Sequence, residues 1–329
     1  MTDAVPMPKA LELLKEYFVE QPEPLLTNKT IQLVLIREVL DYLILRTEET
    51  RELNTVFTPR SANDDRVVER VAFLATKQKG AESRELGALL RTLNERDGRP
   101  DEPCYLKDRL CVKCPRCVLF GATSTERGRE SRQPNIRHRI AYSTAFSLDP
   151  FEDIADTTTF NGVSEATTLT GQTLNVRHSV RPATLFPSVV TLQSVTWKEL
   201  VLALKTIWKS KRYGAEARIG GEVRNHLYGV VAGWEEVITP LEYTLSLAAD
   251  GGTPTRELTY QILEETYKGL ASMKQQVRVL TVAELQRLTD DVRNFEPSRE
   301  FVEAAYQDAA GFRQFQAARQ KEEAARQAR

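Results

Sequence analysis

The chain has 329 residues, of which 41% are hydrophobic and 28% charged, and its formal net charge is −1. This composition can build a hydrophobic core, which excludes a wholly disordered chain. No apolar run approaches the length of a membrane span and no secretory segment follows the start. We therefore expect a cytoplasmic protein with no membrane partner.

The first third of the chain is predicted to contain both helices and strands. A short amphipathic helix is expected over residues 11–19. Residues 31–46 are rich in Ile, Val, Leu and Tyr, which indicates one long strand or two, although a buried helix has a similar pattern. Two helices are expected at residues 64–77 and 82–94, the first because its apolar residues recur at helical spacing.

The middle of the chain is predicted to consist of strands and exposed loops. Residues 121–135 are polar, basic and glycine-containing, which is typical of a mobile loop, and residues 136–146 alternate like a strand. Residues 149–171 are poor in large apolar residues and indicate a protruding hairpin or loop. Residues 181–195 form another predicted strand, whose two prolines favour an edge position or a bulge.

The last third is predicted to be mainly helical. Its clearest helix begins at residues 196–199, whose Thr-x-x-Glu pattern is a capping box. A strand is expected at residues 223–231, and helices at 255–272, 282–293 and 298–326. Strands and helices that do not alternate strictly predict an α+β fold with insertions.

All four cysteines lie in one short segment, CYLKDRLCVKCPRC, at residues 104–117. Four thiolates complete the shell of a tetrahedral Zn²⁺ ion and leave no open position, so we expect a structural zinc site. Its predicted ligands are Cys104, Cys111, Cys114 and Cys117, although the wide first interval allows His138 to replace one of them. Two disulfides, an iron–sulfur cluster and four reduced buried thiols are the alternatives.

Two stretches are strongly basic although the whole chain is nearly neutral. They cover residues 104–139 and 177–226, where Lys and Arg far outnumber Asp and Glu. This asymmetry favours a face that binds a polyanion, against the alternative of basic residues scattered over the surface. In the first stretch the candidate RNA-binding residues are Arg127, Arg129, Arg132, Arg137 and Arg139.

The second basic stretch contains the segment KSKRYGAEARIGGEVRNHLYG, residues 209–229. Cations neutralise phosphate, aromatic rings stack on unpaired bases, and glycines let a backbone N–H approach a phosphate oxygen. The combination indicates a groove for a single strand of nucleic acid. The structural alternative is a helix C-terminus followed by a glycine turn, where the cations interact with the helix dipole.

Catalytic motifs are missing from the sequence. There is no phosphate-binding glycine loop, no zinc-deaminase signature and no nucleophile elbow. The acid-rich residues 149–156 have the ligands for Mg²⁺, but a solvated loop is the favoured explanation.

Three segments resemble the backbone subunit of type I-D CRISPR Cascade, in the Cas-seven family. They are CPRCVLFG at 114–121, RPATLFPSVVTL at 181–192 and KRYGAEARIGGEVRNH at 211–226, and the resemblance covers most of the chain in order. It implies an RRM-like (ferredoxin-like) palm formed by residues 1–99 and 122–329. It also implies a zinc-binding insertion at residues 100–121 and a protruding thumb hairpin at residues 149–176.

The resemblance also implies partners. Several copies would polymerise as a helical filament along a CRISPR RNA, together with the large subunit, the small subunit and the subunit that caps the guide 5′ end. The filament would present the guide to target DNA or RNA. Taken together with the basic stretch, this predicts the following RNA-facing residues: Arg177, His178, Arg181, Lys209, Lys211, Arg212, Tyr213, Gly214, Arg218, Gly220, Gly221, Arg224, Asn225 and His226.

The preferred hypothesis is a non-catalytic guide-RNA scaffold with a structural Zn²⁺ ion. Type III relatives cut target RNA with a loop aspartate, so a nuclease subunit that uses Asp153 or Asp156 with Mg²⁺ is the alternative. A stand-alone zinc-dependent nucleic-acid-binding protein is a third hypothesis.

Overall fold

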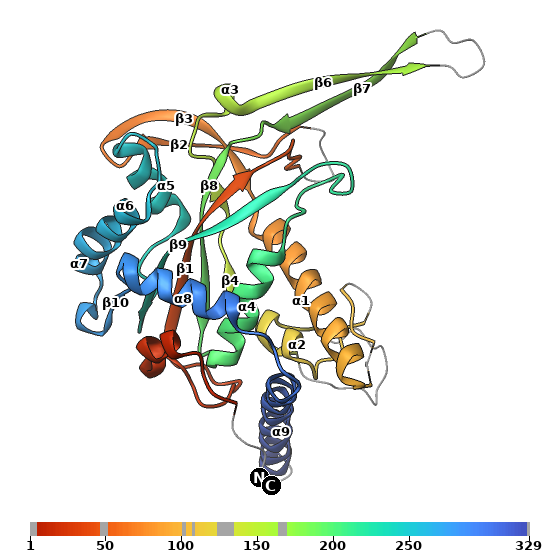
Figure 1. Ribbon diagram of the computed structural model, residues 1–329, viewed down its shortest axis with the longest axis vertical. Coiled ribbons are helices and arrows are strands. Elements are labelled where there is room, and N and C mark those ends of the chain that lie inside the picture. Colours follow the sequence, from red (N-terminus) through yellow and green to blue (C-terminus); the bar gives the residue numbers. More distant parts are fainter. Residues whose placement is uncertain are drawn as a thin grey trace.

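The computed structural model describes residues 5–46, 52–100, 103–106, 109–123, 135–163 and 170–327. Its centre is a five-stranded antiparallel sheet with the strand order β10-β9-β1-β8-β4 (Figure 1). The strands are β1 (Thr30–Val39), β4 (Ile140–Tyr142), β8 (Leu185–Gln193), β9 (Val223–Gly233) and β10 (Arg278–Val279).

Strand β1 is the middle of the sheet and is buried on both faces. Leu33 and Leu35 point into one hydrophobic core, whereas Val34 and Ile36 point into the other. This period of two is the geometry of a strand, so the strand prediction for residues 31–46 is confirmed for its first part and the buried-helix alternative is wrong. After Val39 only isolated bridges continue the pairing.

Helices cover both faces of the sheet. The first core lies beneath the 3-10 helix Lys9–Tyr17 and beneath α1 (Ala75–Asp97), α2 (Pro115–Phe120), α4 (Trp197–Lys209), α8 (Val282–Asn294) and α9 (Arg299–Gln327). The second core lies beneath α5 (Pro240–Ala249), α6 (Arg256–Gln261) and the π-helical turn Ile262–Tyr267, with α7 (Lys268–Leu270) and the short 3-10 turn Lys274–Gln276 beyond them. No helix among the described residues is both long enough and apolar enough to cross a membrane.

Four strands of the sheet and two helices follow one another in the order strand, helix, strand, strand, helix, strand, with other elements inserted between them. Strand β1 is followed by α1 and β4, and β8 is followed by α4 and β9. Helices α1 and α4 pack against each other on the same face of the sheet. The predicted α+β class is therefore confirmed.

The helix predicted at residues 64–77 is wrong. Strands β2 (Thr55–Ser61) and β3 (Asp64–Phe73) form an antiparallel hairpin, and β3 also pairs with β5 (Ala145–Phe146). The helical spacing was misleading because the valines of this segment are β-branched, which suits a pleated strand. Helix α1 begins only at Ala75 and includes the predicted helix 82–94.

Strand β8 is not an edge strand, because it lies between β1 and β4. Strand β4 pairs only with residues 190–192, whereas Pro187 pairs with Ile36 of β1. Pro187, one of the two prolines that suggested an edge strand, therefore lies beyond the end of β4. Its missing N–H removes no hydrogen bond to β4.

A two-stranded hairpin projects from one end of the sheet (Figure 1). The short helix α3 (Phe151–Ile154) leads into β6 (Ala155–Val163), which pairs with β7 (Thr170–Val180). The sequence predicted a hairpin or loop at residues 149–171, and its second strand continues to Val180. The last three predicted helices are confirmed as α6–α7, α8 and α9.

Candidate metal centre and nucleic-acid interface

The four cysteines meet in one group, with all sulfur atoms within 4.8 Å of one another. The Sγ of Cys104 lies 3.7 Å from that of Cys114 and 3.5 Å from that of Cys117, which is 3.9 Å from the Sγ of Cys111. A tetrahedron around one Zn²⁺ ion with bonds of about 2.3 Å has an edge of about 3.8 Å. The group can therefore hold a single metal ion.

Local structure explains how the four sulfurs converge. Cys114 is the N-cap residue of α2 and Cys117 lies in the first turn, where Pro115 begins the helix. Between Cys104 and Cys111 the Tyr105 N–H donates to the Arg109 carbonyl (2.7 Å), which brings the two cysteines together. The Cys111 backbone N–H also donates to the Cys104 Sγ at 3.5 Å, a contact that favours a thiolate.

The alternative ligand and the disulfides are not supported by this geometry. His138 is not part of the metal-ligand group, and all four cysteines are free thiols. Hydrogen bonds from Cys111 and the other two thiols hold the pKa of Cys104 well below its ordinary value, whereas Cys104 and Cys111 raise that of Cys117. Four thiols this close share protons unequally, and a cation would favour the thiolate form of them all.

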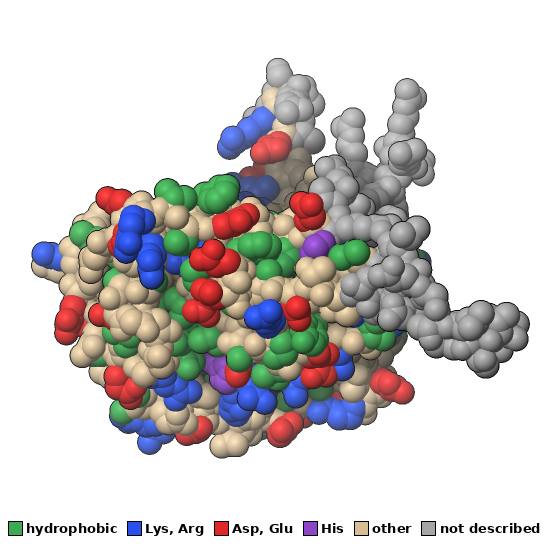
Figure 2. Space-filling view, turned by 90° about the horizontal axis from the view of Figure 1, so that it is seen from above, with side chains coloured by type: hydrophobic (Ala, Val, Ile, Leu, Met, Phe, Trp, Pro, Cys, Tyr) green, Lys and Arg blue, Asp and Glu red, His purple; other side chains and the backbone are tan. Residues whose placement is uncertain are grey.

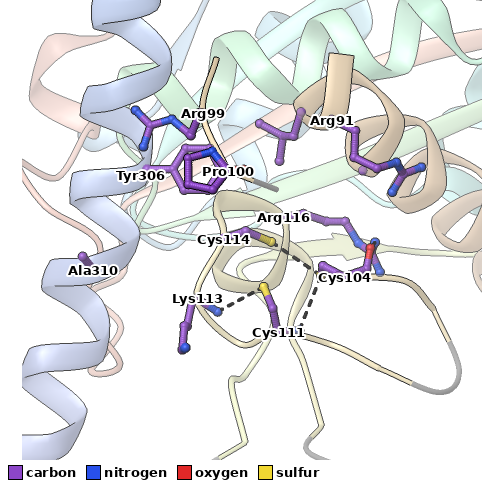
Figure 3. Close-up of a pocket in the computed structure, with 12 residues that line it drawn as sticks. Arg91, Arg99, Pro100, Cys104, Cys111, Lys113, Cys114, Arg116, Tyr306 and Ala310 are labelled. Carbon is purple, nitrogen blue, oxygen red and sulfur yellow. Dashed lines mark hydrogen bonds between the residues drawn. The ribbon is translucent and has the colours of Figure 1, made fainter. Parts of the chain in front are cut away.

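Arg116 fastens the cysteine segment to the helices beside it. Its side chain is 3% exposed and lies against Gly87 of α1, where an added Cβ would come within 2.9 Å of Nη1. Nη1 donates to the Cys104 carbonyl at 3.2 Å. On the other side, Phe312 of α9 packs into the small core around Cys117. The resulting pocket has a volume of about 410 Å³ and lies between the cysteines, α1 and α9. Figure 3 shows the residues that line it.

The second basic segment forms a loop between α4 and β9 at one end of the sheet. Lys209 ends α4 and its Nζ pairs with Glu85 of α1. Lys211 and Arg212 lie beyond the helix, where Arg212 pairs with Glu222 at 2.6 Å across an isolated bridge. The predicted role of these cations in capping a helix is therefore restricted to Lys209.

Most of the predicted RNA-facing cations have an acidic neighbour. Glu38 accepts from His226 at 2.8 Å and lies 3.7 Å from Arg224. The remaining pairs are Arg177 with Glu216 and Arg181 with Asp156, while His178 contacts Thr157. Figure 2 accordingly shows basic and acidic side chains interspersed on the face seen from the hairpin end. Lys211 and Arg218 are exposed and form no ion pair with any described residue.

Two predicted RNA-facing side chains are in fact buried. Tyr213 is 1% exposed and Asn225 is 4% exposed. The Asn225 Nδ2 donates to the Ile207 and Ser210 carbonyls at 2.7 and 2.9 Å, which ties β9 to the end of α4. The prediction that these two side chains contact RNA directly is therefore wrong. They support the loop from inside.

The buried partners of this loop include an ion pair that sequence reasoning missed. Arg37 of β1 lies 2.6 Å from Glu82 of α1, and both side chains are fully buried. Arg37 also donates to Asn225 Oδ1 (2.7 Å) and to the Tyr213 hydroxyl (3.2 Å), and its guanidinium lies against the Phe73 ring. The only sequence signal is one arginine directly after the apolar run at residues 33–36 of β1.

The glycines of the loop are required by the protein's own backbone. At Gly214 (φ +75°) an added Cβ would lie 2.4 Å from the Ile44 carbonyl oxygen, and at Gly221 (φ +72°) it would lie 2.3 Å from that of Tyr213. Gly220 has a milder restriction, with Tyr42 O at 3.0 Å from the added Cβ. The predicted reason, close approach to phosphate, is therefore unnecessary at Gly214 and Gly221.

The model of the Csc2 CRISPR family matches residues 14–321, which is most of the chain. The chain belongs to the Csc2 CRISPR family. The crystal structure of Thermofilum pendens Csc2 is similar at a TM-score of 0.63 and 20% identity, over 93% of this chain and 96% of that one. A comparison with curated proteins finds no match.

Two further similarities are too low to support an argument about the fold. A chain of a type IV-B CRISPR complex is 12% identical over 60% of this chain and 90% of that one, with a TM-score of 0.42. A chain of a CRISPR RNA-guided surveillance complex is 13% identical over 72% and 85%, with a TM-score of 0.45.

In this Csc2 chain the first basic stretch contributes less than predicted. Arg127, Arg129 and Arg132 lie outside the described residues, and Arg137 is exposed. Arg139 is 2% exposed and donates to both carboxylate oxygens of Glu199, so it is withdrawn as an RNA contact. It links the loop after α2 to the start of α4.

The loop glycines of the Csc2 chain give a first testable prediction. Gly221→Ala is expected to destabilise the protein by about 2–5 kcal/mol, because a left-handed backbone and a backbone clash add together. Gly98→Ala is the control, since Gly98 also has a left-handed φ (+65°) but its added Cβ meets nothing within 4 Å. We expect about 1–2 kcal/mol there. Urea unfolding measures both, and equal losses would contradict the clash.

Proposed function

We propose that this chain is the CRISPR RNA-binding backbone subunit of a type I-D Cascade complex, polymerising along the guide RNA and presenting it to a target strand. The observation that carries the proposal is the family match over residues 14–321. Its partners would be the CRISPR RNA, the paired target DNA or RNA, further copies of itself and the large, small and guide 5′-end-capping subunits.

The sheet topology supports an RRM-like palm. Strands β1, β4, β8 and β9 with helices α1 and α4 follow the β-α-β-β-α-β order of a ferredoxin-like unit, with β1 and β8 in the centre. We assign residues 1–99 and 122–329 to this palm and its helical additions. The face that lies opposite α1 and α4 is covered by α5 and α6 over the β1 side chains Val34 and Ile36, so RNA would bind at the loop end of the sheet.

The cysteine segment, residues 100–121, would be a zinc-binding insertion with a structural role. Sulfur separations of 3.5–3.9 Å support one tetrahedral ion over an iron–sulfur cluster, whose several irons hold their cysteines further apart. Four thiolates leave the ion no open position, so its contribution would be to the folding of the segment.

The hairpin β6–β7 is the proposed thumb. It projects beyond the sheet (Figure 1), and its base is joined to the basic loop by Arg177 and Glu216, 3.6 Å apart. A displacement of the hairpin by a neighbouring copy would therefore act on the loop that we propose to hold RNA.

The nuclease alternative has no support among the described residues. Asp153 is exposed on α3, and Asp156 lies 4.0 Å from Arg181. Burial raises the pKa of Asp149, with a further contribution from the charge of Asp153. In the part of the chain that the structure describes, the four cysteines are the only cluster of potential metal ligands.

The proposed function is tested by replacing Lys211 and Arg218, the two exposed cations of the loop that form no ion pair with a described residue. Lys211→Ala with Arg218→Ala is expected to weaken binding of single-stranded RNA equally for different sequences, because both side chains would contact phosphate. Two lost contacts should reduce the slope of log K against log[salt] by about 1.4. Fluorescence anisotropy at several salt concentrations measures both quantities.

The matched control is Lys9→Ala with Lys15→Ala, because these exposed lysines lie on the 3-10 helix at the other end of the sheet (Figure 1). It should leave RNA affinity unchanged. An unchanged slope in the Lys211 and Arg218 variant would refute the RNA-facing assignment of the loop.

A further inference from the structure

A groove of about 700 Å³ lies at the edge of β9, between the end of α4, the start of α6 and one side of α8. Strand β10 pairs with β9 only at residues 231–232, so in the described part of the chain the edge before them has no further strand beside it. The groove is lined by Trp208, His226, Tyr228, Arg256, Gln286 and Arg293.

The groove combines aromatic rings with cations. The rings of His226 and Tyr228 meet edge to face with their centres 6.3 Å apart, and the Arg293 guanidinium lies 4.8 Å from the centre of the Trp208 ring. Arg256 donates to the side-chain oxygen of Gln286. Glu257 is the one acidic residue of the lining, so arginines are in excess.

The indole N–H of Trp208 is a hydrogen-bond donor with no acceptor among the described residues. Its Nε1 is buried and has no hydrogen-bond partner in the described protein. Buried polar atoms normally have a partner, and their exceptions call for an explanation. Trp208 also lines the groove, so its ring can contact a ligand there, although Nε1 itself is buried.

The groove also continues the segment that we assigned to RNA. Trp208 directly precedes Lys209 at the end of α4. His226 lies two residues after Arg224 on β9, so the side chains of His226 and Arg224 share a face of that strand. Stacking rings with guanidinium groups are the usual means of holding unpaired nucleotides. A pocket of this volume is large enough for a ligand of nucleotide size.

We propose that the β9 groove holds a nucleotide of the bound RNA strand. Its base would lie among the rings of Trp208, His226 and Tyr228, and its phosphate would contact Arg256 and Arg293. The inference rests on the proposed function, because it extends the RNA path beyond the loop of Lys211 and Arg218.

Tryptophan fluorescence provides the test. The chain has three tryptophans, so Trp197→Phe with Trp234→Phe leaves Trp208 as the sole emitter. Single-stranded RNA of mixed sequence, added to the purified RNA-free chain, is expected to change Trp208 emission saturably.

Arg256→Ala with Arg293→Ala should weaken RNA binding about tenfold and abolish the RNA-dependent change in Trp208 emission. Arg287→Ala, on the same helix but outside the groove, is the matched control and should alter neither.

The outcomes separate this inference from the proposed function. If the Lys211 and Arg218 variant weakens RNA binding while the Arg256 and Arg293 variant does not, the groove assignment is wrong and the function stands. If neither variant affects RNA binding, both fail. If the groove variant binds RNA normally but no longer joins a protein subunit, the groove is a protein-binding site and our inference is overturned.

Discussion

Arg37→Met is expected to destabilise the protein by about 3–5 kcal/mol, because it leaves the carboxylate of Glu82 buried without its cation. Burial lowers the pKa of Arg37, but Glu82 and the nearby tyrosine hydroxyls raise it by more, so the guanidinium stays charged. Glu82 would keep only the hydroxyls of Tyr213 (2.8 Å) and Tyr142 (2.5 Å). Asn225 would lose the donor to its Oδ1.

The matched control is Arg46→Met. Arg46 pairs with Glu216 at 3.2 Å, but its side chain is 26% exposed and that of Glu216 is 37% exposed. Exposed pairs contribute about 0–1 kcal/mol. Urea denaturation of both variants gives the comparison, and a loss at Arg37 no larger than that at Arg46 would contradict the importance of burial. Since Tyr213 and Asn225 hold the basic loop, we also expect RNA affinity to fall in the Arg37 variant.

Cys114→Ser combined with Cys117→Ser is expected to remove the metal and most of the soluble yield. Metal binding in such a segment is part of its folding free energy, on the order of 10 kcal/mol in small zinc domains. The same segment supplies Val118 and Cys117 to the core around Phe312. Losing the metal should therefore also loosen α9 from the body of the protein.

Elemental analysis measures the metal directly, and we expect one zinc ion per chain before mutation and none after it. Because all four cysteines belong to the site, the control is the unmutated protein treated with a strong chelator, whose melting temperature should fall and recover when Zn²⁺ is returned. Iron with visible absorption would establish a cluster instead, and unmutated protein without metal would refute the site.

Local signals predicted several helices well. The capping boxes at Thr196 and Thr281 are both present, with the hydroxyl of each threonine bonded to the N–H of the glutamate three residues later. The same pattern at Thr239 begins α5, so the sequence contains a signal for this helix too. The β2–β3 hairpin was missed because its buried end depends on distant partners, such as Phe146 opposite Ala72.

The metal site was the part of the candidate site that the sequence could predict. The cysteine spacing indicated a metal group because the ligands lie close along the chain. Burial of charged residues was not predictable in this way. Arg139 and Arg37 are buried because Glu199 and Glu82, far away in sequence, neutralise them. Composition cannot distinguish such an arginine from one that faces RNA, so the basic stretch overestimated the free positive charge.

The central position of β1 has a consequence for synthesis on the ribosome. Thr30 pairs with Gln193 on one side and with Gly233 on the other, so the most buried strand is made long before either neighbour. At roughly 5–20 residues per second the strand waits on the order of 10 s for β9. During that time its apolar sequence has the features of an aggregation-prone segment. The complete sheet can therefore form only after β9 has been made, and we expect the nascent chain to need a chaperone until then.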